Sequence, residues 1–234
     1  MHLYPPGQIL MIDADDTLWE NNILFDRAIA SFIEFLDHKT HTPTEVRGHL
    51  NRIEHERVKV HGYGLAAFRE SLAICFEELA GIKATTEHRS EIDRFTAIIA
   101  GEEMLLLDGV RETLHHLHQR HRLLLVTKGA DDEQRKKLRN SGLEQYFHDV
   151  EVLREKHTDA YCALHCRHAC ELDRTWMIGN SPKSDINPAL AAGFNAIYIP
   201  HPNTWVLEEE EVHPPAEGPR LVTLERFSQL AQLF

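Results

Sequence analysis

Two aspartates stand where a short apolar run ends near the start of the chain. Residues 9–12 (ILMI) lead into Asp13 and Asp15, and Thr17 follows. Side chains alternate along an extended strand, so the two carboxylates can lean toward one site. Carboxylates held that close repel each other and are costly to desolvate. A divalent cation such as Mg²⁺, which prefers oxygen ligands, relieves both costs. The alternative is that these acidic residues only cap a following helix.

Polar residues of a consistent kind follow three further apolar runs. These are Thr127, Lys128, Lys156, Asn180, Ser181, Ser184 and Asp185. The carboxyl ends of parallel strands share one edge of a sheet, and ligands bind beyond that edge. A site there would combine carboxylates, a hydroxyl group and an ammonium group. That combination suits an anion bridged by a metal ion, with phosphate the prime candidate.

The elements that must position these residues alternate between strand and helix. Apolar runs predict strands over residues 9–12, 122–127, 149–153, 175–178, 196–199 and 221–223. Helical patterns lie at residues 109–119, 131–140, 158–170, 182–192 and 224–234. Repeated strand–helix units indicate an α/β fold, a Rossmann-like parallel sheet flanked by helices.

Residues 20–103 interrupt this alternation with helical patterns alone. The expected helices cover residues 23–36, 45–60, 65–79 and 86–99, and Thr44 is the expected cap of the second. Their apolar stripes could form a small bundle. We therefore expect a core domain of residues 1–19 and 104–234, with an all-helical domain of residues 20–103 inserted into it.

Composition limits the partners and the setting. The 234 residues carry a formal net charge of −12, which argues against nucleic-acid backbones and anionic membranes as main partners. A small anionic substrate stays open, because a site can be locally positive. No run approaches a membrane span, no targeting segment is visible, and the four cysteines do not resemble a secreted disulfide framework. A soluble protein of the reducing cytoplasm is expected, of unknown oligomeric state.

Together, these motifs resemble those of the haloacid dehalogenase-like (HAD) superfamily of hydrolases. The resemblance covers nearly the whole chain, and the inserted helices match the cap of the C1 type. Four motifs carry it in order: Asp13, Asp15 and Thr17 as D-x-D-x-T; Thr127; Lys156; and Gly179-Asn180-Ser181-x-x-Ser184-Asp185. The resemblance implies a Mg²⁺-dependent phosphatase acting on a small phosphorylated substrate.

The resemblance also implies a role for each catalytic residue. Asp13 would attack phosphorus and form an aspartyl-phosphate, and Asp15 would be the general acid and base. Thr127 and Lys156 would offset the charge of the transferring group. The expected Mg²⁺ ligands are Asp13, the backbone carbonyl of Asp15, Asp185 and Asn180. Many relatives have Asp where this chain has Asn180, so Asp185 is the expected charged contributor.

Substrate contacts are expected from both domains. Thr127, Lys128 and Lys156 would bind the phosphoryl group. Tyr63 lies between two glycines in a loop of the helical insert, which in C1-capped relatives helps to choose the substrate. Trp19 follows the first motif, near the expected cap hinge. The alternatives are that Tyr63 only connects two helices and that Trp19 packs between domains. The sequence does not name the substrate.

Other readings of the fold stay open. A 2-haloacid dehalogenase keeps the nucleophilic Asp but lacks the second acid of the first motif and needs no metal, whereas Asp15 is present here. A phosphomutase would need a cap that holds a doubly phosphorylated intermediate. A binding or regulatory protein with negligible turnover is favoured only by Asn180. Two segments are expected to be structural: the acidic residues 207–219 as a solvated loop, and the cysteine series Cys162, Cys166 and Cys170 as core packing.

Overall fold

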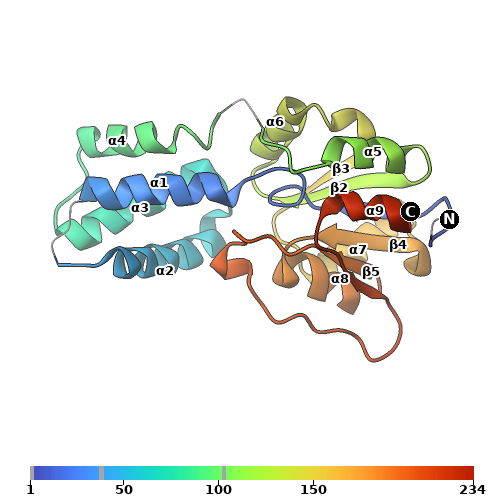
Figure 1. Cartoon of the computed structure of the whole chain (residues 1–234). Coiled ribbons are helices and arrows are strands. Elements are labelled where there is room, and N and C mark those ends of the chain that lie inside the picture. Colours follow the sequence, from blue (N-terminus) through green and yellow to red (C-terminus); the bar gives the residue numbers. More distant parts are fainter. Residues whose placement is uncertain (1–2, 37–39, 102–103) are drawn as a thin grey trace. The chain divides into compact units, whose positions relative to one another are not determined.

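The computed structural model describes residues 3–36, 40–101 and 104–234 and divides into two compact units (Figure 1). The first consists of Met1–Glu20 and Glu103–Phe234, and the second of Asn21–Glu102. The second unit is inserted into the first, directly after the D-x-D-x-T motif. Its role as a cap stays a prediction.

A parallel sheet forms the centre of the first unit. In the described ranges it has the order β3-β2-β1-β4-β5-β6. β1 lies at the centre, pairing with β2 in the register Ile9↔Arg122 and with β4 in the register Ile9↔Thr175. The expected α/β fold with a parallel sheet is thereby confirmed. The strands are β1 (Ile9–Ile12), β2 (Arg122–Lys128), β3 (Asp149–Leu153), β4 (Thr175–Gly179), β5 (Asn195–Tyr198) and β6 (Leu221–Thr223).

Helices cover both faces of the sheet because successive strand residues point to opposite sides. In β1, Leu10 and Ile12 belong to one buried cluster and Met11 to another. The first cluster contains side chains of α5 (Val110–His118), α6 (Asp131–Ser141) and α9 (Leu230–Leu233). The second contains side chains of α7 (Thr158–His168) and α8 (Asn187–Ala191). Apolar burial on both faces explains why β1 is an unbroken apolar run.

The helix predicted over residues 182–192 is not regular. A π-helical turn covers Pro182–Ile186, and the α-helix begins only at Asn187. Pro188 explains the break, because it has no N–H to donate to the carbonyl of Ser184 four residues earlier. The Tyr161 hydroxyl donates to that carbonyl instead, at 2.9 Å. The helix predicted over 224–234 is also shorter, a 3₁₀ turn at Phe227–Gln229 followed by α9.

The second unit contains helices and no strand in the residues described. They are α1 (Asn22–Leu36), α2 (Pro43–His61), α3 (Leu65–Ala80) and α4 (Thr86–Thr96), packed around their own buried cluster. Thr44 was expected to cap α2, but the cap is Thr42. Its hydroxyl accepts from the Glu45 N–H at 3.3 Å, and the Glu45 carboxylate accepts from the Thr42 N–H at 2.7 Å. Pro43 is the first helical residue, where a missing N–H costs nothing.

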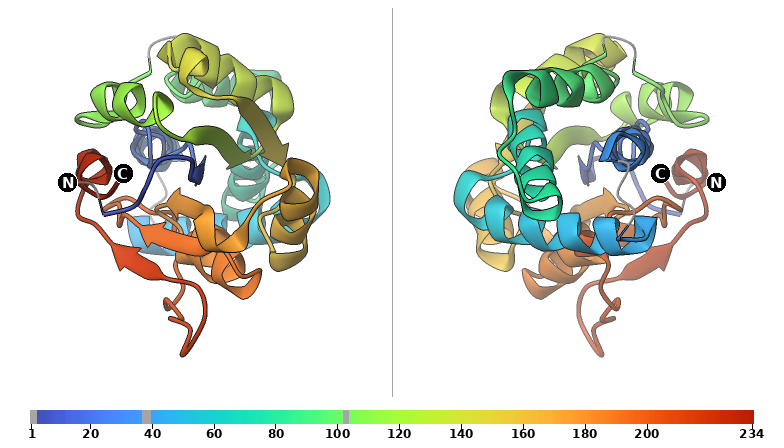
Figure 2. Two further views of the ribbon diagram at one scale, coloured as in Figure 1. Left: turned by 90° about the vertical axis from the view of Figure 1, so that its right-hand side faces the viewer. Right: turned by 90° about the vertical axis from the view of Figure 1, so that its left-hand side faces the viewer.

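The two ends of the described chain lie side by side (Figures 1 and 2). The Tyr4 N–H donates to the Leu233 carbonyl at 2.8 Å. The rings of Tyr4, Trp176 and Phe234 pack against one another, with centroids 4.6–5.5 Å apart. Both ends are therefore held against the sheet.

The prediction that Cys162, Cys166 and Cys170 pack in the core is right for Cys170 and wrong for the other two. Cys170 is buried, as is Cys75, but Cys162 and Cys166 are exposed on α7. They lie four residues apart on the outer side of the helix, where no core packing is available.

No helix in the described part of the chain has both the length and the apolarity to cross a membrane.

Candidate active site

Four side chains from three motifs meet at the carboxyl end of β1: Asp13 and Thr17 of the first motif, Lys156 and Asp185. The Lys156 ammonium lies 2.5 Å from Asp13 Oδ1 and 2.7 Å from Asp185 Oδ1. The Thr17 hydroxyl donates to Asp13 Oδ2 at 3.0 Å. All four side chains are buried. One ammonium thus bridges two carboxylates inside the protein, and both Asp13 oxygens are engaged.

Burial and charge act against each other here. The pKa of Asp13 is raised to about 7, chiefly by burial. The charge of Lys156 lowers this pKa, whereas the charges of Asp185 and Asp15 raise it. Burial also disfavours the charged form of Lys156, but the attraction of Asp13 and Asp185 outweighs it and raises the pKa of the ammonium. Lys156 therefore stays charged and is the counter-ion on which the paired carboxylates depend.

Asp15 is turned toward helix α6. The Lys137 ammonium lies 2.9 Å from both of its oxygens, and Gln134 donates to Oδ2 at 3.0 Å. The Trp19 indole N–H donates to Oδ1 at 2.7 Å. Burial opposes ionisation, but Lys137 and these hydrogen bonds hold the pKa of Asp15 below its usual value. Lys137 and Gln134 were not predicted, because α6 carries no motif and meets Asp15 only through the fold.

A tight turn separates the strand from the second unit. Asp16 adopts a left-handed conformation with φ 59°, which Asp tolerates better than most residues. Its N–H donates to the Trp19 carbonyl at 2.8 Å. The turn brings Thr17 back to Asp13 and Trp19 to Asp15. His201, after β5, lies 3.8 Å from Asp16 and 3.5 Å from Glu20 and so borders the same turn.

Thr127 and Lys128 end the neighbouring strand. The buried Thr127 hydroxyl donates to Gln134 Oε1 at 3.4 Å. Gln134 thereby joins Thr127 to Asp15, since its amide N–H₂ donates to that carboxylate. The Lys128 ammonium donates to Ser184 Oγ at 2.8 Å and to Glu208 Oε1 at 2.5 Å.

The last motif places an amide and a carboxylate beside Asp13. Asn180 Oδ1 lies 3.4 Å from the Thr17 hydroxyl, and its N–H₂ donates to Thr204 at 3.2 Å. Asp185 Oδ2 accepts from the Ser181 N–H at 2.9 Å. Gly179 permits this approach, because a Cβ there would lie 2.2 Å from Asp185 Oδ2. Any other residue at position 179 would displace the carboxylate.

These oxygens fit a hard divalent cation. Asp13, Asp185 and Asn180 offer carboxylate and amide oxygens at one strand edge, and no nitrogen or sulfur ligand is needed. Among the described residues, two further groups combine acidic side chains with a histidine: Asp16, Glu20 and His201, which border the turn after β1, and Asp149, Glu151 and His168. In the second of these, Arg122 and Arg167 already bind His168 and Glu151.

Glu208 was missed by the sequence interpretation. Residues 207–219 were expected to form a solvated loop, but Glu208 is buried, with 8 % of its surface exposed. It binds Lys128 and accepts from the hydroxyls of Ser181 and Ser184. Its neighbours Glu209, Glu210 and Glu211 are exposed, so nothing in the run of four glutamates distinguishes the buried one.

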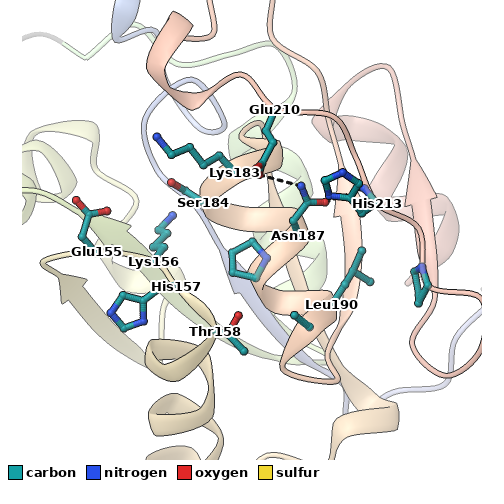
Figure 3. Close-up of a pocket in the computed structure, with 13 residues that line it drawn as sticks. Glu155, Lys156, His157, Thr158, Lys183, Ser184, Asn187, Leu190, Glu210 and His213 are labelled. Atoms are coloured by element: carbon teal, nitrogen blue, oxygen red, sulfur yellow. Dashed lines mark hydrogen bonds between the residues drawn. The ribbon is translucent and has the colours of Figure 1, made fainter. Parts of the chain in front are cut away.

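A pocket of about 600 Å³ opens beside Lys156 and Ser184. Figure 3 shows Glu155, Lys156, His157 and Thr158 on one side and residues of the π-turn and α8 on the other. Glu210 and His213 of the loop after β5 also line the pocket, and Asn187 donates to Glu210 and to the Glu211 carbonyl. Lys156 therefore lies at the edge of open space, together with the three residues Glu155, His157 and Thr158 of its own segment.

The two other predicted substrate contacts differ in their surroundings. Trp19 is fully buried within the first unit's core and points its N–H at Asp15, so its visible role is to hold that carboxylate. Tyr63 lies between α2 and α3 in the second unit. Contact of either residue with substrate stays a prediction.

The fold and the site together define a hydrolase of the haloacid dehalogenase-like type. The family model of haloacid dehalogenase-like hydrolases matches residues 8–193, and the chain belongs to this family. A search of curated proteins finds no match.

Solved structures show the same fold along almost the whole chain. A haloacid dehalogenase-like family hydrolase from Xanthomonas campestris is 26% identical, with a TM-score of 0.80, covering 97% of this chain and 94% of its own. The HAD-hydrolase YfnB from Bacillus subtilis, bound to magnesium, is 20% identical, with a TM-score of 0.64 and coverage of 96% and 97%. L-2-haloacid dehalogenase from Xanthobacter autotrophicus is 16% identical, with a TM-score of 0.66 and coverage of 97% and 98%. The last two likenesses concern the fold alone.

Proposed function

We propose that this hydrolase is a Mg²⁺-dependent phosphatase that cleaves a small phosphomonoester in the cytoplasm. One observation carries the proposal. At the end of the central strand, Asp13 is held by Lys156 and Thr17, and a second carboxylate, Asp15, stands two residues away with partners of its own. Nucleophile and proton carrier are thus distinct groups on one short segment.

In the proposed reaction, Asp13 attacks phosphorus and the bond from phosphorus to the ester oxygen breaks. Asp15 gives its proton to the leaving oxygen. It then takes a proton from the water that attacks the aspartyl-phosphate, which frees phosphate and restores Asp13. Lys137 keeps Asp15 ionised in the free protein. A dianionic ester bound nearby would raise the pKa of Asp15 by like-charge repulsion and favour the protonated form that the first step needs.

Thr127 and Lys156 would bind the phosphoryl oxygens as charge develops on them. Groups fixed in place in this way are worth about 3 kcal/mol each, or roughly 10²-fold in rate. Lys156 is fixed by two carboxylates and Thr127 by Gln134. Little reorganisation is then needed during the reaction.

The proposed ligands of Mg²⁺ are Asp13, the backbone carbonyl of Asp15, Asp185 and Asn180. When bound, the ion would offset the negative charge of the phosphoryl group and of the two carboxylates. The carboxylate and amide oxygens described above support these ligands, and a relative from Bacillus subtilis bound to magnesium supports the choice of metal. Because Asn180 brings no charge, Asp185 would supply the second negative ligand.

The second unit, in this proposal, is a cap of the C1 type that closes over the site and selects the substrate. Tyr63, Trp19 and Lys128 are the proposed further contacts with substrate. Sugar phosphates, nucleoside monophosphates and phosphoglycolate-like acids all remain open.

Dehalogenation is the second candidate, because the fold is shared with L-2-haloacid dehalogenase. Asp15, held in place by three partners, speaks against it, since the dehalogenase branch lacks this acid. A phosphomutase or a weakly catalytic binding protein would use the same fold.

The test is phosphate release from a panel of small phosphomonoesters, with and without Mg²⁺, by the wild type and Asp13→Asn. The exposed Asp173→Asn serves as the matched control. Metal-dependent release that Asp13→Asn abolishes and Asp173→Asn retains supports the proposal. Halide release from 2-haloacids without metal would replace it with dehalogenation. Ligand binding without turnover on any ester would point to a binding role.

A further inference from the structure

One carboxylate outside the four motifs lies at the centre of a polar network beside the site. Glu208 Oε1 accepts from the Lys128 ammonium at 2.5 Å, and Oε2 accepts from the Ser181 hydroxyl at 2.8 Å and from the Ser184 hydroxyl. Ser184 Oγ also accepts from Lys128 at 2.8 Å. Both oxygens of Glu208 are therefore used.

This network touches two motifs at once. Lys128 directly follows Thr127, at the end of β2. Ser181 and Ser184 belong to the turn that carries Asp185, and the Ser181 N–H donates to the Asp185 carboxylate. Glu208 therefore joins the strand end that carries Thr127 to the turn that presents Asp185 to Lys156.

The negative charge of Glu208 is stabilised by Lys128 and by two serine hydroxyls. Burial disfavours its ionised form, but Lys128 and the two serines outweigh burial and lower its pKa. The Lys128 side chain is only 14 % exposed, so its ammonium is directed by its partners rather than by water. Hydrogen bonds to a charged group are shorter and stronger than neutral ones, and they fix direction as well as distance.

We infer that Glu208 is a positioning residue of the active site, which orients Lys128 and the Ser181–Ser184 turn for the reaction at Asp13. The inference rests on the proposed function of that site. It goes beyond the four motifs, because Glu208 contacts neither Asp13 nor Lys156 and acts through other residues.

A purely structural role as a loop anchor explains the contacts less well. The loop is fastened independently, since Asn187 binds Glu210, the Glu211 carbonyl and the His213 N–H. Lys183, labelled in Figure 3, also donates to the Leu207 carbonyl at 2.6 Å. Fastening the loop therefore does not need a buried charge, whereas directing Lys128 does.

The first test compares Glu208→Gln, which keeps the shape and removes the charge, with Glu209→Gln, its exposed neighbour. Partners that orient groups in a site typically affect activity by about 10- to 100-fold. We expect kcat of phosphate release to fall in that range for Glu208→Gln, with a smaller change in KM, and to stay at the wild-type value for Glu209→Gln. Glu208→Asp, which keeps the carboxylate, should recover part of the loss. Unchanged kcat in a folded Glu208→Gln protein would overturn the inference.

The second test needs no turnover and so separates this inference from the proposed phosphatase activity. Trace acetylation, read by mass spectrometry, compares Lys128 with Lys83, which is 90 % exposed. Lys128 should react several-fold faster in Glu208→Gln than in the wild type, while Lys83 should not change. If no ester is hydrolysed, the proposed function fails. The acetylation rate of Lys128 then decides by itself whether Glu208 positions this lysine. Equal Lys128 rates in both proteins would refute its positioning role. If Glu208→Gln does not fold, Glu208→Asp takes its place in both tests, with the same direction of change expected.

Discussion

A buried carboxyl group in the second unit makes the stability of the helices depend on pH. Glu54, on α2, has 8 % of its surface exposed, and its Oε2 has no hydrogen-bond partner in the part of the chain described. Arg47, whose charge favours ionised Glu54, is paired with Asp26 at 3.1 Å. Burial raises the pKa of Glu54 to about 7; Arg47 lowers it only in part, and Asp26 pushes it up.

The size of the effect follows from this shift. The pKa rises from 4.5 in the unfolded chain to about 7 in the folded one, and each pKa unit corresponds to about 1.4 kcal/mol. Between these two values the folded unit binds more protons than the unfolded chain. The contribution of Glu54 to the free energy of unfolding is therefore fully present below pH 4.5. It falls as the pH rises, and about 3 kcal/mol has been lost once the pH passes 7.

Glu54→Gln keeps the shape of the side chain and cannot ionise. We expect the variant to match the wild type near pH 4.5 and to exceed its stability by up to about 3 kcal/mol at pH 8. Hydrogen exchange of peptides from α2, followed by mass spectrometry at both pH values, reports on this unit directly. Glu56→Gln, exposed on the same helix and paired with Arg52, is the control and should show no such pH dependence.

The reasoning is refuted if the difference in protection between Glu54→Gln and the wild type is the same at pH 8 as at pH 4.5. That result would mean that Glu54 is ionised in the folded protein and finds a partner at neutral pH. A uniform loss of protection in Glu54→Gln at both values would instead mark the amide as a poor fit, with no titration involved.

Three further predictions concern the first unit. Lys137→Met removes the cation that lowers the pKa of Asp15. Because the first step needs protonated Asp15, the alkaline limb of kcat/KM against pH should move to higher pH, and an unmoved limb would show that Asp15 does not carry the proton. Lys156→Met leaves two buried carboxylates without their counter-ion and should lower the free energy of unfolding in urea by about 3–5 kcal/mol, and equal stability would mean that water reaches the pair. Trp19→Phe keeps the apolar ring but removes the donor to Asp15, which should cost about 1.5–3 kcal/mol in urea unfolding and leave KM less affected than kcat.

Much of the site can be predicted from the sequence, because its polar residues directly follow the apolar runs that form the strands. Asp13, Thr127, Lys156 and Asp185 each follow an apolar run or its loop, and the structure brings Asp13, Lys156 and Asp185 into direct contact. The strand bounds are also close to the predicted ones, since strands buried on both faces leave a clear apolar signal.

The missed residues have no such local signal. Lys137 reaches Asp15 from the middle of a highly charged helix, and Glu208 is one of four successive glutamates. Their contacts span 122 and 80 residues of sequence, so they depend on the folded arrangement. The π-turn was missed for a similar reason. Pro188 removes a hydrogen bond, but whether the freed carbonyl finds a donor depends on Tyr161 from another helix.

The central position of β1 has a consequence for synthesis on the ribosome. This strand is translated before the rest of its sheet, since its partners β2 and β4 begin only at Arg122 and Thr175. The whole helical insert is translated in between, and its contacts within residues 21–102 allow it to fold while Ile9–Ile12 still lacks both neighbours. Pairing between distant segments is slow, and an unpaired apolar strand invites aggregation. We therefore expect nascent chains that end before residue 175 to expose this apolar tetrapeptide, although Leu10, Met11 and Ile12 are fully buried in the folded protein.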